Sequence, residues 1–399
     1  MSLQNQNGKS STSQITIVGA GLAGLTAAIM CAEGGANVSL LEAHGVLGGR
    51  ARSSDGPYKA NFGPHVLYKD GPFWQWMAER DLLPRYAGLP LAPVKLRWQG
   101  QLRRTPPLGA IPSVLRLRGR EAPTDLDFRS WAASHTDERT AAMLSAAAGV
   151  YTFFHDPGSL AASFVWPRTI RTLLSPPPKA RYALGGWNAL VSTLETRARE
   201  LGVRIETGCA VDELPAPPVI VATELGEARK LLADKSLRWT GGHTVCLDLG
   251  LRHRRGDPFV VADLDEAGWI ERFTAPDPSL APEGEELIQA QMPIRPKEDT
   301  ERAAARLEQL LDVSLPDWRE RETWHRRQVL DARSGALDMP GETWRDRPAV
   351  DRGDGVFLAG DMVAAPGLLS EVSWASALRA SRLALDAVTS AHPRLRRVA

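Results

Sequence analysis

The chain has 399 residues, of which 43% are hydrophobic and 24% are charged, a composition typical of a globular protein and not of a disordered or fibrous one. This length suits about two domains. The net charge of +1 provides no overall basic field for nucleic acid, so we expect no nucleic-acid partner.

Targeting and metal signals are missing from the sequence. Residues 1–13 are polar without the apolar run of a secretory signal, and we expect them to form a flexible tail. No stretch approaches the roughly 20 apolar residues of a membrane span. The cysteines, Cys31, Cys209 and Cys246, lack the spacing of metal ligands. These features predict a cytoplasmic protein with reduced cysteines and no metal site.

A dinucleotide-binding motif follows the tail. The apolar run 15–18 leads into Gly19, Ala20 and Gly21, and Gly24 begins an alanine-rich stretch that we expect to be helical. In this motif the first glycine allows a tight turn, the second lets the backbone approach a pyrophosphate, and the third lets the helix pack closely on the strand. The helix N-terminus offers unpaired N–H groups to the anion.

Glu42 ends a second predicted strand, residues 37–41, about 20 residues beyond the glycines. A carboxylate at this position can accept hydrogen bonds from a ribose diol. It therefore favours an adenosine ribose without a phosphate, as in FAD or NAD. The alternative is an ordinary glycine-rich turn, but strand, turn, helix, strand and acid occur here in order within about 30 residues.

A second glycine-rich loop directly follows the acid and contains Gly48, Gly49 and Arg50. The arginine can neutralise a pyrophosphate, and the glycines let the backbone lie against a flat ring. A plain surface turn is the alternative. His65 follows a turn further along the chain. It either faces the reaction centre or has a structural role, which the sequence alone slightly favours.

Aromatic residues and prolines accumulate between residues 69 and 181. Most of these rings are expected to be plain core, but a few should line a pocket, with Tyr151, Phe153 and Phe154 the best candidates. The segment 108–120 mixes apolar residues with arginines, which can rest on a bilayer surface. Its prolines favour an ordinary surface segment, so peripheral membrane contact stays an alternative.

The rest of the chain returns to alternating patterns. The predicted elements are a helix over 189–198, strands over 203–206 and 219–223, a strand from 243, a helix over 300–311, a strand over 355–359 and a long helix after 367. Between the last two, Gly360 permits a close approach and Asp361 can accept hydrogen bonds from sugar-alcohol hydroxyls. The helix N-terminus can stabilise negative charge on a reduced ring.

Together these motifs resemble the FAD-dependent flavin amine oxidase and phytoene desaturase superfamily, which has the glutathione-reductase-type FAD fold. The motifs that carry the resemblance are residues 19–24, Glu42, residues 48–50, Gly185-Gly186, Val211, Ala222-Thr223 and residues 359–361. The fold expected is α/β, a Rossmann-like FAD-binding domain (14–68, 182–242 and 345–390) with a discontinuous α+β substrate domain (69–181 and 243–344).

The resemblance implies FAD with its adenosine at Glu42, its pyrophosphate at Ala20, Gly21 and Arg50, and its ribityl hydroxyls at Asp361. It also implies that the adenine lies near the Val211 backbone and that Gly63, Pro64, Glu371 and Val372 lie close to the isoalloxazine ring. The expected cofactor-binding residues are therefore Gly19, Ala20, Gly21, Gly24, Glu42, Gly49, Arg50, Gly63, Pro64, Val211, Gly360, Asp361 and Val372.

The chain departs from this family in two respects. Monoamine oxidase-like members place a lysine near the flavin, but this chain has no lysine between Lys235 and Lys297. No cysteine that could carry covalent flavin follows Cys246. We therefore expect noncovalent FAD, and a typical amine oxidase mechanism is in doubt.

The main functional hypothesis is an FAD-dependent dehydrogenase, desaturase or oxidase that removes a hydride equivalent from an apolar or aromatic-bearing small molecule. The nominated catalytic residues are His65, Tyr151 and Glu371. One alternative is an amine or amino-acid oxidase of the same superfamily. Another is a non-catalytic binding protein resembling the Rab GDP-dissociation inhibitors, which the joint presence of Glu42, Arg50 and Asp361 disfavours.

Overall fold

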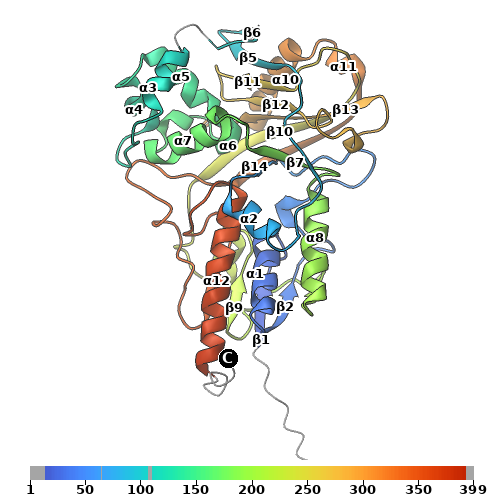
Figure 1. The fold of residues 1–399 in the computed structure, drawn as a ribbon, viewed down its shortest axis with the longest axis vertical. Helices are drawn as coiled ribbons and strands as arrows, with labels where there is room; N and C mark the ends of the chain where they lie inside the picture. The colour runs from blue at the N-terminus through green and yellow to red at the C-terminus, as the bar shows by residue number, and fades with distance from the viewer. Residues whose placement is uncertain (1–13, 64, 107–109, 392–399) are drawn as a thin grey trace, which may run out of the picture.

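The computed structural model describes residues 14–63, 65–106 and 110–391. Figure 1 shows a lower part with a parallel sheet between helices and an upper part with a larger sheet beside a group of short helices. Three expectations fall wholly or partly outside the described residues: the flexible tail over 1–13, Pro64, and part of the segment 108–120.

The lower part is built on a five-stranded parallel sheet with the order β15-β9-β1-β2-β8. Its strands are β1 (Gln14–Val18), β2 (Asn37–Leu41), β8 (Arg204–Glu206), β9 (Val219–Val221) and β15 (Val356–Leu358). The three residues of β9 are all buried, as expected of a parallel strand covered on both faces. The predicted α/β Rossmann-like fold is confirmed.

Helices from distant parts of the chain cover this sheet: α1 (Leu22–Glu33), α8 (Trp187–Glu200), α9 (Leu225–Leu231) and α12 (Ser370–Ala391). The long α12 runs beside α1 (Figure 1), and Ala377, Ala380 and Ala384 of α12 are fully buried in the shared core. Small side chains let the two helices approach closely. The C-terminal helix is therefore part of the domain that the first strand begins.

The upper part contains a seven-stranded sheet with the order β14-β10-β13-β12-β11-β5-β6. Its strands, in chain order, are β5 (Val94–Trp98), β6 (Gln101–Arg103), β10 (Gly241–Arg252), β11 (Val260–Asp263), β12 (Trp269–Arg272), β13 (Glu285–Pro293) and β14 (Glu322–Ala336). Only the β11–β5 pair is parallel. A small antiparallel sheet joins β3 (Leu67–Tyr68), β7 (Ala180–Ala183) and β4 (Tyr86–Ala87).

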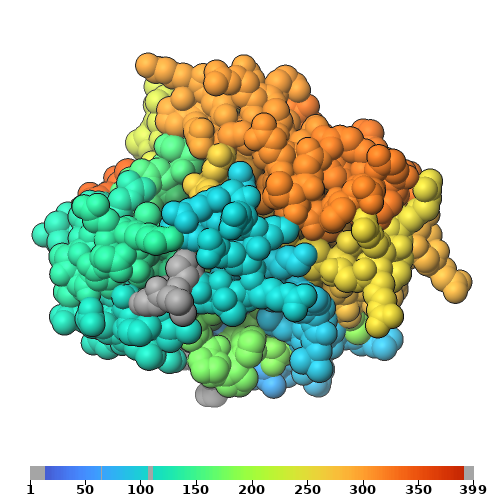
Figure 2. All heavy atoms as spheres, turned by 90° about the horizontal axis from the view of Figure 1, so that it is seen from above, coloured from blue at the N-terminus to red at the C-terminus, as the bar shows by residue number. Residues whose placement is uncertain are grey.

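Two groups of helices flank the large sheet. One group consists of α3 (Ala110–Leu117), α4 (Phe128–Ala133), α5 (Glu138–Ala147), α6 (Gly149–Thr152) and α7 (Ala162–Thr169). The other consists of α10 (Thr300–Ser314) and α11 (Trp318–Arg321). Seen from above, the α3–α5 region in teal and the α10 region in orange lie on opposite sides (Figure 2). The predicted helix 300–311 begins as expected, since the Asp299 side chain caps its N-terminus.

The helix α2 (Pro72–Ala78) packs on the lower part. Its aromatic residues Phe73, Trp74 and Trp76 are buried in the core of the parallel sheet, although their sequence region was assigned to the substrate domain. The expected domain boundaries stay a prediction. Within the described residues, no helix combines the length and apolar character that a membrane crossing requires. In α3, Ile111 and Leu115 are each 61% exposed, and the membrane contact stays a prediction.

The contact between α1 and the turn before it yields a first prediction. A Cβ atom on Gly24 would lie 1.8 Å from the carbonyl oxygen of Gly19. Gly24→Ala should therefore lower the free energy of unfolding by about 3 kcal/mol or more, because a backbone atom has to move. Gly45→Ala is the control, because its Cβ would meet nothing within 4 Å. Urea unfolding measures both, and equal effects would contradict the prediction.

Candidate functional site

The three glycine positions of the first motif differ in how much room they leave for a side chain. Gly19 has φ +98°, and a Cβ there would lie 2.8 Å from the carbonyl oxygen of Ala222 on the neighbouring strand connection. The contact of Gly24 with Gly19 explains the third glycine. Gly21 has an ordinary φ of −73°, and its Cβ would meet no described atom nearer than the Gly48 carbonyl oxygen at 4.0 Å. The packing of the protein therefore explains two glycines but leaves Gly21 unexplained.

Glu42 closes this turn from the end of β2. One carboxylate oxygen accepts from the Ala20 backbone N–H at 2.8 Å, and the other accepts from the His44 backbone N–H at 3.0 Å. The residue is only 6% exposed. Because a carboxylate has about four acceptor positions, Glu42 can hold the turn and still accept a hydrogen bond from a ribose hydroxyl.

Arg50 and Asp361 form a two-pronged ion pair between the two ends of the chain. The Arg50 Nη1 and Nη2 atoms lie 2.6 and 2.8 Å from the carboxylate oxygens of Asp361, which is 311 positions away in the sequence. Nη1 also donates to the carbonyl oxygen of Arg333. Burial acts to lower the pKa of Arg50, but the charge and hydrogen bonds of Asp361, together with the charge of Glu224, raise this pKa above its usual value. The two residues predicted to bind different parts of the cofactor thus lie in contact.

Asp361 is presented by the end of β15 and the turn after it. The Gly360 N–H donates to the Ser376 hydroxyl of α12 at 2.9 Å, and that hydroxyl donates back to the Gly360 carbonyl. The side chain of Asp361 is 17% exposed. These bonds fix the Gly-Asp turn against the C-terminal helix, so the carboxylate points toward the loop that carries Arg50.

His65 lies behind the same loop. Its Nε2 atom is 2.9 Å from the carbonyl oxygen of Arg50. Since a carbonyl only accepts, Nε2 carries the proton, and Nδ1 is the unprotonated nitrogen of the neutral ring. The ring centroid lies 4.7 Å from that of Trp187. Burial lowers the pKa of His65 to about 4, so the imidazole is neutral at pH 7.

The other two nominated catalytic side chains are already engaged. The Tyr151 hydroxyl donates to the carbonyl oxygen of Val165 at 3.0 Å and lies 2.7 Å from the Thr169 hydroxyl. Burial raises the pKa of Tyr151 above its usual value. Glu371 pairs through both oxygens with Arg171, at 2.7 and 2.6 Å. The catalytic roles of all three residues stay predictions, and these contacts give Tyr151 and Glu371 structural roles as well.

A small cavity lies beside Asp361, with about 20 Å³ open to the centre of a water-sized sphere. Tyr151 and Val372 line it, so the predicted substrate side and the predicted cofactor side meet there. Phe153 and Phe154 do not line it. Gly63 has φ +102° and lies near His65, and Val211 packs partly buried against the core of the parallel sheet. Their cofactor roles stay predictions.

Two arginines in the wall of this cavity, Arg168 and Arg347, were not found by sequence reasoning. Neither belongs to a motif, and the sequence has 48 lysines and arginines in total. What sets these arginines apart is the set of distant residues that each one faces, and that placement has no local sequence signal.

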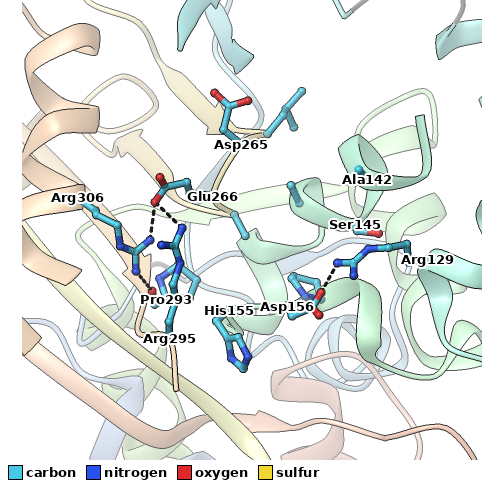
Figure 3. Close-up of a pocket in the computed structure, with 14 residues that line it drawn as sticks. Arg129, Ala142, Ser145, His155, Asp156, Asp265, Glu266, Pro293, Arg295 and Arg306 are labelled. Carbon is cyan, nitrogen blue, oxygen red and sulfur yellow. Dashed lines mark hydrogen bonds and ion pairs between the residues drawn. The ribbon is translucent and has the colours of Figure 1, made fainter. Parts of the chain in front are cut away.

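A larger cavity, of about 180 Å³, lies apart from these residues, between α5 and the turn that joins β11 and β12. Figure 3 shows Arg129 directed at Asp156, and Arg295 and Arg306 directed at Glu266. Each of these three arginines has an acidic partner. The charges of this cavity are therefore balanced within the protein.

The buried imidazole yields a second prediction. Folding favours neutral His65, whose pKa is about 4 in the folded chain and about 6.5 when unfolded. This contribution is complete above pH 6.5 and is lost as the pH falls toward 4, to a total of about 3 kcal/mol.

Urea unfolding of the wild type and of His65→Gln at pH 7.5 and pH 4.5 measures this difference. The wild type should lose about 2.5 kcal/mol more than the variant over this interval. Equal losses would show that the imidazole is not held in its neutral form.

Comparisons with known proteins agree with this geometry. Residues 17–80 match the NAD(P)-binding Rossmann-like domain family. A search among curated proteins gives no match. An oxidoreductase from Methanosarcina mazei is similar in structure, with a TM-score of 0.74, 15% identity, and coverage of 94% of this chain and 100% of its own.

Two further solved structures are similar over most of this chain. Cyclohexylamine oxidase from Brevibacterium oxydans has a TM-score of 0.67 at 15% identity and covers 96% of this chain and 100% of its own. A reduced UDP-galactopyranose mutase has a TM-score of 0.69 at 13% identity and covers 96% and 98%. The chain therefore has the fold of the FAD-dependent oxidoreductase superfamily, and the resemblance read from its motifs is confirmed at the level of the fold.

Proposed function

We propose that this protein binds FAD noncovalently and is an oxidoreductase that removes a hydride equivalent from a small molecule. The observation that carries the proposal is Gly21. Its backbone conformation suits any residue. A Cβ atom there would have no described atom nearer than the carbonyl oxygen of Gly48, at 4.0 Å. A ligand that approaches the backbone is the physical reason left for a glycine at this position.

The surroundings of Gly21 fit the pyrophosphate of a dinucleotide. The position lies at the N-terminus of α1, whose N–H groups and dipole favour an anion. Gly48 pairs with Gly21 as an isolated bridge, and Arg50 follows two residues later. A guanidinium can bind phosphate oxygens through two parallel N–H bonds. Glu42 at the end of β2 fits the adenosine ribose.

When bound, FAD would supply the ring that accepts the hydride equivalent. The chain's own residues would orient the substrate and exclude water. Leu368, Leu369 and Val372 form an apolar wall of the cavity beside Asp361, which supports an apolar substrate body. The unprotonated Nδ1 of His65 can hold a proton, although its lowered pKa makes it a weak base.

A substitution at Gly21 separates cofactor binding from folding. Gly21→Val should fold, with a loss of about 1 kcal/mol for the changed helix cap, because its side chain enters open space. It should contain less than about a tenth of the wild-type flavin, since the side chain fills the space of the pyrophosphate. Flavin absorbance after denaturation and urea unfolding are the two measurements.

Gly88→Val is the matched control, because this glycine also faces open space but lies outside both glycine-rich loops. It should retain the wild-type flavin content. A colourless wild-type protein that also fails to bind added FAD would refute the cofactor assignment. It would favour a non-catalytic binding protein.

The hydride-acceptor role is tested by anaerobic mixing of the flavin-bound protein with separate apolar alcohols, amines and amino acids. Bleaching of the oxidised flavin spectrum by one class identifies the bond that is oxidised. Bleaching by amines alone would favour the amine oxidase alternative. A flavin that stays oxidised with every compound, while dithionite still reduces it, would count against an oxidoreductase.

A further inference from the structure

Arg168 is a cation without an acidic partner in the wall of the small cavity. Its Nη1 donates to the carbonyl oxygen of Phe164, and its Nη2 donates to that of Gly367, both at 2.9 Å. The guanidinium carbon lies 3.9 Å from the centroid of the Phe164 ring. In the part of the chain that the structure describes, no carboxylate oxygen lies within the 4.0 Å of an ion pair. Two carbonyls therefore use two of the five donors of a guanidinium.

The arginines around Arg168 are all neutralised. Arg50 pairs with Asp361, and Arg171 pairs with Glu371 and Asp70. Arg347, which also lines the cavity, makes two bonds to Asp338 at 2.9 and 2.8 Å. Burial and the nearby charge of Arg347 lower the pKa of Arg168 to about 10. Of these four arginines, Arg168 is therefore the one without a described carboxylate at ion-pair distance.

A hydroxyl in the same wall also lacks a partner. The Ser334 Oγ atom is buried and forms no hydrogen bond with any described residue, and Ser334 lines the cavity with Arg168. An anion in the cavity would accept from the hydroxyl and from the guanidinium. Buried polar groups and charges usually have partners, because leaving them unpaired costs free energy.

We propose that Arg168 and Ser334 bind a carboxylate group of the substrate. A carboxylate matches the planar geometry of a guanidinium and can accept from both residues. The inference rests on the proposed oxidoreductase function and sharpens it. The substrate is then an apolar molecule that also carries a carboxylate, and this group anchors it in the wall next to Asp361 and Val372.

The contrast with the larger cavity supports this choice. There Arg129, Arg295 and Arg306 each face an acidic side chain (Figure 3). An anion entering that cavity would compete with existing ion pairs. At Arg168 it would compete with no described carboxylate, so the small cavity is the better anion site despite its size.

Acetate is the probe for this site, and acetamide is its uncharged counterpart of the same shape. Both are titrated against the protein as purified, with Tm as the readout. Sodium chloride replaces sodium acetate at equal ionic strength in the reference samples, so that a Tm shift reports the carboxylate and not the salt. Acetate should raise the Tm of the wild type in a saturable way, and acetamide should not.

Arg168→Met should raise the acetate concentration that gives half of the Tm shift by about tenfold or more, the effect of losing a charge-assisted bond. Arg168→Lys should give a smaller increase, because it keeps the charge and loses the planar fork. This variant keeps the test decisive if Arg168→Met fails to fold. Arg129→Met, which removes a paired arginine from the larger cavity, is the control and should behave as the wild type.

Equal acetate responses in the wild type and Arg168→Met, or equal responses to acetate and acetamide, would overturn the inference. Equal responses are also expected if Arg168 only stabilises negative charge on the reduced cofactor, since the oxidised protein would then bind no acetate. Flavin content is measured on the same samples. A wild type that has no flavin and fails to bind added FAD refutes the proposed function, whereas normal flavin with acetate binding that does not depend on Arg168 refutes only this inference.

Discussion

The ion pair between Arg50 and Asp361 holds the candidate site together. It joins the loop after the second strand to the turn after the last strand, across 311 positions of sequence. Both side chains are partly buried, at 31% and 17% exposure, so solvent screens the pair less than it screens a surface pair.

The same pair sets the electrostatics for an incoming phosphate. Glu224 lies near Arg50 at 3.9 Å and pairs with Arg333 at 3.1 Å. The four charges of Arg50, Asp361, Glu224 and Arg333 therefore sum to zero. Attraction of a pyrophosphate depends on how the donors are placed, through the free N–H groups of α1 and the remaining donors of Arg50, and not on net charge.

Local chemistry explains which parts of the site the sequence could predict. The turn at residues 19–24 and Glu42 were predictable because each role is set within one strand–turn–helix–strand unit. The contact of Arg50 with Asp361 was not, since each residue was assigned its own part of the cofactor and nothing in the sequence pairs them. The aromatic helix α2 was placed with the substrate region, yet its rings belong to the core of the parallel sheet, because sequence neighbours need not share a core.

Two arginines three residues apart illustrate the part that only three dimensions reveal. Arg168 ends α7 next to a π-helical turn, Ile170–Leu174, which contains Arg171, and such turns are frequent at functional sites. Arg168 donates to the carbonyl of Gly367, while Arg171 binds Glu371. The two arginines thus bind both ends of the turn that starts α12. They hold this turn between the helical region and the Gly-Asp turn. In sequence they are equivalent, but only Arg171 meets carboxylates, and this difference leaves Arg168 with the charge that a substrate carboxylate would neutralise.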